Sequence, residues 1–129
     1  MLGIRRPDHL REHPLRGAIF EAWVVSEILK ARVHRGLPPA LSFFRDRKGN
    51  EVDVVLEAGD GLVAVETKSA QTVASDFFAS LEVLAALLGT GRRRPRLRRV
   101  VVYGGTERQQ RTGVEVLPWS AIDHYTWGD

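Results

Sequence analysis

The chain has 129 residues, of which 43% are hydrophobic, and a formal net charge of +3. This length supports one domain with its own core and excludes two domains of ordinary size. The hydrophobic content excludes a disordered chain, and the lack of cysteine excludes disulfides and thiolate metal sites. No apolar stretch approaches the roughly 20 residues that span a bilayer. With no export signal, the cytoplasm is the expected compartment.

The first half of the chain predicts one helix followed by three strands. After a polar lead-in over residues 1–16, apolar residues at helical spacing predict a helix over 17–33. A strand over 41–45 and a turn over 46–50 follow. Two β-branched runs over 51–57 and 62–68 flank a short glycine-containing turn, which is typical of a β-hairpin.

The second half predicts one more helix and two more strands. An apolar stripe predicts a helix over 75–88, and six arginines between residues 92 and 99 predict a basic loop. Val100–Tyr103 is apolar on both faces, which indicates a strand buried between layers. A weaker strand is expected over 114–117. The order α-β-β-β-α-β-β therefore predicts an α/β domain, with a mixed sheet flanked by helices.

The hairpin brings charged residues together. If Glu57 lies opposite Leu62, then Asp53 lies opposite Glu66, and alternation places Lys68 on the same face. Two carboxylates directly opposite each other on adjacent strands repel, so this pattern predicts a cation between them. A carboxylate pair with open positions suits Mg²⁺, which keeps several waters. The other face of the hairpin is apolar and is expected to be a core face, formed by Val52, Val54, Leu56, Val63 and Val65.

This arrangement resembles the PD-(D/E)XK nuclease superfamily, which has a restriction-endonuclease-like α-β-β-β-α-β core. The matching residues are Glu21 on the first helix, Asp53 on the second strand and Glu66-Thr67-Lys68 on the third. One departure is that Val52, not proline, precedes Asp53.

The resemblance implies that Asp53 and Glu66 bind Mg²⁺ or Mn²⁺, with Glu21 completing the metal site. Lys68 would hold the attacking water or the scissile phosphate as a point charge. All four residues are therefore candidate catalytic residues. Gln71, just after the third strand, is expected to touch the phosphate backbone.

A second resemblance covers nearly the whole chain. The segments 2–5, 13–21, 44–46 and 65–68, together with Glu51-Val52-Asp53, are similar to the C-terminal domain of unknown function of a family of prokaryotic AAA-type ATPases. In that family a P-loop ATPase domain comes first, whereas this chain has no G-x-x-x-x-G-K-[ST] motif and is expected to lack ATPase activity. We therefore expect a C-terminal fragment or a stand-alone remnant. Residues 1–16 would be the remnant of a longer N-terminal region, and residues 17–129 a single nuclease-like domain.

Two functions fit these residues. The first is a metal-dependent phosphodiesterase that acts on DNA. The second is a catalytically silent nuclease-fold module that binds nucleic acid or a protein partner of an ATPase. A pI of about 9.8 favours anionic partners only mildly. The oligomeric state stays open.

Each candidate residue also has a plainer interpretation. The charged hairpin face is also explained by solubility, Glu21 by a structural partner such as Arg45, and Lys68 by an ion pair with Glu51. The basic loop is expected at the far end of the fold from Asp53 or at a flank, as a solvated connection or as a general phosphate-binding segment formed by Arg92, Arg93 and Arg94. Among the aromatic residues, Trp23, Phe77 and Phe78 are expected in the core, and Trp119 and Trp127 are candidate exposed stacking platforms.

Overall fold

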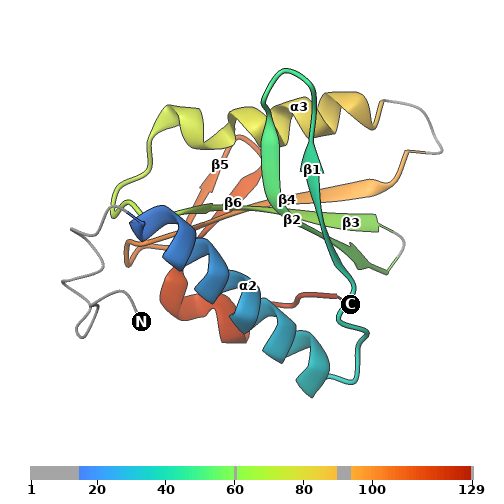
Figure 1. Cartoon of the computed structure of the whole chain (residues 1–129), viewed down its shortest axis with the longest axis vertical. Helices are drawn as coiled ribbons and strands as arrows, with labels where there is room; N and C mark the ends of the chain where they lie inside the picture. Colours follow the sequence, from blue (N-terminus) through green and yellow to red (C-terminus); the bar gives the residue numbers. More distant parts are fainter. Residues whose placement is uncertain (1–14, 60, 90–93, 129) are drawn as a thin grey trace.

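A six-stranded mixed sheet carries the fold, and a computed structural model describes residues 15–59, 61–89 and 94–128 (Figure 1). The strand order is β1-β2-β3-β4-β6-β5. The strands are β1 (Leu41–Arg45), β2 (Glu51–Ala58), β3 (Gly61–Lys68), β4 (Arg96–Tyr103), β5 (Gln109–Arg111) and β6 (Val114–Pro118). The helices are α2 (Arg16–His34) and α3 (Ala79–Leu87), with the short 3-10 helices η1 (Ser75–Phe78) and η2 (Trp119–His124). The expected α/β class with a mixed sheet is confirmed.

The strand pairing follows the predicted hairpin and crossover. β2 and β3 pair antiparallel with Glu57 opposite Leu62, as the alternation predicted. η1 and α3 then lead to β4, which pairs parallel with β3. β6 adds a further parallel neighbour to β4, and β5 lines the edge antiparallel to β6. β5 was not predicted, because its three polar residues carry no strand pattern.

Helices cover both faces of the sheet. Figure 1 shows α3 above the sheet and α2 with η2 below it. The cluster under α2 joins the helix stripe to alternate strand residues: Phe20, Val24, Ile28, Val54, Leu56, Val63, Val65, Val100 and Val102. The cluster under α3 joins residues of η1 and α3 to the strand residues that face this side of the sheet: Val52, Ala64, Phe77, Leu81, Leu84, Val101, Tyr103, Val114 and Val116. The parallel strand β4 is therefore buried on both faces, as its continuous apolar run indicated.

Val52 packs on the opposite face from the one predicted. It belongs to the cluster under α3, whereas Val54 belongs to the cluster under α2. The cause is an irregularity in β2, since Ser42 pairs with Val55 but Phe44 pairs with Val52. Two steps along β1 thus match three along β2, so one extra residue of β2 reverses the alternation there.

The basic segment is partly strand and not wholly a loop. Arg96, Arg98 and Arg99 lie in β4, because their backbone pairs with the beginning of β3. Their side chains are accommodated at the sheet surface. The Arg98 guanidinium lies 5.5 Å from the centre of the Tyr125 ring, and Arg99 forms an ion pair with Glu82 at 2.9 Å.

A buried arginine joins the end of α2 to three other segments. Arg32 continues the i, i+4 stripe of α2 and is only 3% exposed. Its guanidinium donates hydrogen bonds to the carbonyl oxygens of Pro38 at 2.9 Å, Glu57 at 3.1 Å and Trp127 at 2.7 Å. These bonds connect α2 to the following loop, the end of β2 and the C-terminal segment.

Two tryptophans exchange their expected roles. Trp127 is 1% exposed, and its indole N–H donates to the Ile122 carbonyl at 2.7 Å, so it is a core residue and not a stacking platform. Trp23 is 39% exposed and packs edge-on against Trp119, although a core position was expected. Both Phe77 and Phe78 pack in the cluster under α3, as predicted.

No helix among the described residues is long and apolar enough to cross a membrane.

Candidate functional site

Asp53 is held at the point where β2 turns away from β3. The paired residues of the two strands extend from Ala58 and Gly61 to Val54 and Val65. Beyond that pair, the Thr67 backbone N–H donates to Asp53 Oδ2 at 2.7 Å, and the Thr67 hydroxyl donates to the same oxygen at 2.9 Å. The Asp53 side chain therefore acts as an acceptor that a regular strand would supply from its backbone.

Glu66 lies against Asp53 in the protein interior. It is 6% exposed, one of two charged residues among the buried described ones. Burial raises the pKa of Glu66 to about 9, helped by a hydrogen bond to Asp53 and by the Asp53 charge, and opposed by the Lys68 charge. Glu66 is therefore protonated at neutral pH, and it shares its proton with the Asp53 carboxylate.

The three hairpin residues do not share one regular face as predicted. Glu66 and Lys68 lie two apart on β3 and so leave the same face. Asp53 comes from the irregular part of β2 and meets both Glu66 and Thr67, whose side chains leave opposite faces of β3. The acids therefore converge where β2 turns away from β3, and not across a regular β-ladder.

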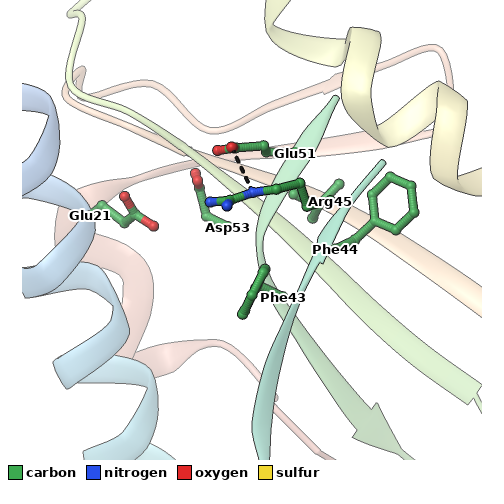
Figure 2. A pocket seen from close by; sticks show the side chains of 7 residues that line it. Glu21, Phe43, Phe44, Arg45, Glu51 and Asp53 are labelled. Carbon is green, nitrogen blue, oxygen red and sulfur yellow. Dashed lines mark ion pairs between the residues drawn. The ribbon is translucent and has the colours of Figure 1, made fainter. Parts of the chain in front are cut away.

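Glu21 approaches Asp53 from α2. Figure 2 shows the Glu21 carboxylate pointing from the helix toward the end of Asp53. The pKa of Glu21 is raised, first by burial, then by the charge of Asp53 and a hydrogen bond to it, and last by the charge of Glu51. Three acids from three elements therefore share one neighbourhood.

A pocket of about 210 Å³ opens beside these acids between α2 and the β1–β2 pair. Arg45 lies in it and forms an ion pair with Glu51, with 2.9 Å between Nε and Oε1. The plainer interpretation of Glu21 gave it Arg45 as a structural partner. In the structure the ion-pair partner of Arg45 is Glu51, although Glu21 and Arg45 line the same pocket. The pocket is lined by Glu21, Phe43, Phe44, Arg45, Glu51, Val52 and Asp53 (Figure 2).

Lys68 lies at the end of β3 and is half-buried. Its ammonium lies 5.7 Å from the centre of the Phe77 ring, within the range of a cation–π contact. The alternative ion pair with Glu51 is not formed, because Glu51 pairs with Arg45. Among the described residues Lys68 forms no ion pair, so its charge acts on the neighbouring Glu66.

Gly104, the first of two glycines after β4, supports the segment that follows Lys68. The Gly104 N–H donates to the carbonyl oxygens of Lys68 at 3.1 Å and Ala70 at 2.9 Å. A Cβ on Gly104 would lie 2.3 Å from the Ser69 carbonyl oxygen, so any other residue would displace that segment. The sequence had marked these glycines only as a strand boundary. Thr67, the middle residue of the Glu-x-Lys motif, was likewise missed as the donor to Asp53.

Of the predicted nucleic-acid-binding residues, the two that the structure describes, Gln71 and Arg94, lie outside this cluster. Gln71 is exposed in the connection after β3. Arg92 and Arg93 lie outside the described residues, and Arg94 is exposed just before β4. β4 begins beside Gly61 and ends beside Lys68, so Arg94 is at the far end of the sheet from the acids, as expected.

Asp53 and Glu66, with Glu21, are the residues that could hold a metal ion. Their donor set consists of carboxylate oxygens, which fits Mg²⁺ or Mn²⁺. Among the described residues, however, no three Asp, Glu or His side chains are arranged to hold a cation as they stand. A cation held there would need Glu66 as a carboxylate, so its binding would compete with the proton on Glu66.

The protonation of Glu66 predicts a pH-dependent stability. Its pKa rises from an ordinary 4.5 to about 9 on folding, so the folded state holds a proton that the unfolded state releases between these values. This contribution is complete below the lower pKa and is lost as the pH rises toward the higher one, at about 1.4 kcal/mol per pH unit. Glu66→Gln, which does not titrate, is expected to flatten this loss.

Urea unfolding in EDTA at about pH 5.5 and about pH 8 measures the difference. Glu57→Gln is the matched control, because Glu57 is an exposed glutamate on the same hairpin. An equal fall in the free energy of unfolding for wild type and Glu66→Gln would show that Glu66 is ionised in the fold.

Comparison with known families gives one match. A family described as a domain of unknown function, DUF4143, matches residues 16–122, from the first residue of α2 into η2. No curated protein matches the chain.

Proposed function

Because the chain belongs to the DUF4143 family, whose description carries no activity, we propose a function from the site: a divalent-metal-dependent phosphodiesterase that acts on DNA. The chain would be a nuclease of the PD-(D/E)XK type. The order α2-β1-β2-β3-α3-β4 supports this proposal, since the elements follow one another as in the α-β-β-β-α-β core of that superfamily.

The contact between Asp53 and the buried Glu66 carries the proposal. A buried carboxyl beside a second carboxylate costs free energy, and a fold that needed only packing would place an apolar side chain there. Here Thr67 holds Asp53 in place with two hydrogen bonds, and Glu21 adds a third acid. When bound, a divalent cation would lower the pKa of a coordinated water and neutralise charge on the phosphate.

The remaining proposed roles belong to residues at the C-terminal ends of β3 and β4 and in the connection after β3. Lys68 lies two residues beyond Glu66 on the same face of β3, where a point charge would orient the water or the scissile phosphate. The Gly104 N–H fixes the backbone at Lys68 by donating a hydrogen bond to the Lys68 carbonyl oxygen. Gln71, exposed just beyond, would contact the phosphate backbone.

The partner proposed alongside DNA is an ATPase domain. The basis is the similarity of the chain to the C-terminal domain of a family of AAA-type ATPases, together with the lack of a P-loop motif in this sequence. ATP hydrolysis would then be supplied outside these 129 residues.

Two observations favour the alternative of a catalytically silent module. Asp53 Oδ2 already accepts two hydrogen bonds from Thr67, and no cation-ready group of three acids is found in the described part of the chain. In such a module the acid pair would be structural, and the domain would bind nucleic acid or a protein without cleaving.

A cleavage assay separates the two functions. The protein is incubated with plasmid and with labelled oligonucleotides, in Mn²⁺ and in EDTA. The nuclease proposal expects products only in Mn²⁺. Intact substrates in both conditions, at protein concentrations that bind the DNA, would favour the silent module.

A further inference from the structure

Phe43 is an exposed aromatic side chain at the rim of the acid pocket. It is 66% exposed, the most exposed of the large apolar side chains described. Single exposed apolar residues are common, but this one lines the same pocket as Glu21 and Asp53 (Figure 2). It also lies on β1, an edge strand of the sheet, where a ligand can approach.

Alternation along β1 explains this position. Leu41, Phe43 and Arg45 lie two apart and leave the same face. Leu41 packs against the core cluster under α2. Phe43 and Arg45 continue that face toward Glu21, beyond the part that the helix covers.

Arg45 adds a cation to the aromatic ring. Its guanidinium lies 5.6 Å from the centre of the Phe43 ring, and its side chain is 63% exposed. Its ion pair with Glu51, itself 53% exposed, is a surface pair. Such pairs contribute little to stability, so a phosphate can replace Glu51 as the partner of Arg45.

We propose that Phe43 and Arg45 form a nucleotide subsite, in which Phe43 stacks on an unpaired base and Arg45 contacts an adjacent phosphate. The bases of an intact duplex are stacked on each other and are not available to a protein side chain. An exposed aromatic ring can instead stack on an unpaired base. The substrate class is therefore a single strand, or a duplex with a frayed end or flap. This inference deepens the proposed function, because it assigns a substrate class to the same pocket.

Fluorescence anisotropy in EDTA tests the subsite without any cleavage. Wild type and Phe43→Ala are titrated into a labelled single strand and into the matching duplex. Phe43→Ala is expected to weaken single-strand binding about 10-fold or more, within the range for one base stacked on an aromatic ring. Duplex binding is expected to change by less than about 2-fold.

Three further variants complete the test. Leu87→Ala removes an equally exposed apolar side chain, 64% exposed on α3, and is expected to bind like wild type. Phe43→Trp keeps an aromatic ring and is expected to retain single-strand binding. Arg45→Ala is expected to lower the salt dependence by about 0.7 units of log–log slope, as for one phosphate contact.

The outcomes separate this subsite from the nuclease proposal. Equal single-strand affinity for Phe43→Ala and Leu87→Ala, or an equal loss for single strand and duplex, would overturn the subsite. Either result, with Mn²⁺-dependent cleavage by wild type, leaves the nuclease proposal standing. A selective loss in Phe43→Ala, without cleavage by wild type, supports the subsite on a silent module.

Discussion

Lys68→Ala is expected to lower DNA cleavage by at least about 100-fold while leaving Mn²⁺ affinity within about 3-fold of wild type. In the proposed reaction the ammonium would stabilise charge that develops on the phosphate, and loss of one such group costs about 100- to 1000-fold in rate. The acid cluster itself stays intact, because Asp53 is held by Thr67. Loss of the Lys68 charge raises the pKa of Glu66 but also removes repulsion between the ammonium and the cation, so the two effects on metal affinity oppose each other.

Two other variants give this result its meaning. Asp53→Ala is expected to lose both cleavage and metal binding, because it removes a carboxylate of the proposed metal site. Lys48→Ala removes a lysine from the exposed turn between β1 and β2 and should cleave like wild type. Single-turnover cleavage and calorimetry on each variant provide the two readouts. If Lys68→Ala cleaves at the wild-type rate, Lys68 has no part in the reaction.

Arg32→Ala is expected to destabilise the fold by about 3–5 kcal/mol. The substitution leaves three carbonyl oxygens, that of Trp127 buried, without their charged donor, and hydrogen bonds to charged groups are each worth about 1.5–3 kcal/mol. The bonds join α2 to β2 and to the C-terminal segment, so their loss should release Trp127 as well. The melting temperature should fall by more than about 10 °C.

Lys30→Ala is the matched control for this effect. Lys30 lies two residues earlier on α2, is 61% exposed, and forms an i, i+3 ion pair with Glu27 at 3.3 Å. Its loss should cost about 0.5 kcal/mol or less. Arg32→Lys keeps the charge but not the planar fork, and should fall between wild type and Arg32→Ala. A small effect of Arg32→Ala, equal to that of Lys30→Ala, would mean that water replaces the guanidinium.

The sequence predicted the parts of the fold that rest on periodicity. The alternation over 51–68 gave the β2–β3 register, and the apolar run at Val100–Tyr103 gave a strand buried on both faces. The extra residue in β2 escaped prediction, because a bulge changes the pairing without changing residue types. Val52 was therefore assigned to the wrong face.

Single polar residues in apolar stripes were the harder cases. Arg32 follows Phe20, Val24 and Ile28 at i+4 spacing, and this continuation was the only signal of its burial. Trp127 and Trp23 were misplaced because composition does not tell which tryptophan a neighbouring element covers. At the site, the motif order predicted which acids meet, whereas the bonds from Thr67 depend on where β2 leaves β3.

Calorimetric titration with Mn²⁺, in two buffers of different ionisation enthalpy, tests most directly whether the Asp53–Glu66 pair is a cation site. We expect one ion to bind and to displace close to one proton near pH 7, because Glu66 with a pKa of about 9 must ionise to become a ligand. Proton release should vanish well above that pKa, and binding should be lost in Asp53→Ala. No binding at millimolar Mn²⁺, or binding that Asp53→Ala retains, would contradict a metal site at this pair.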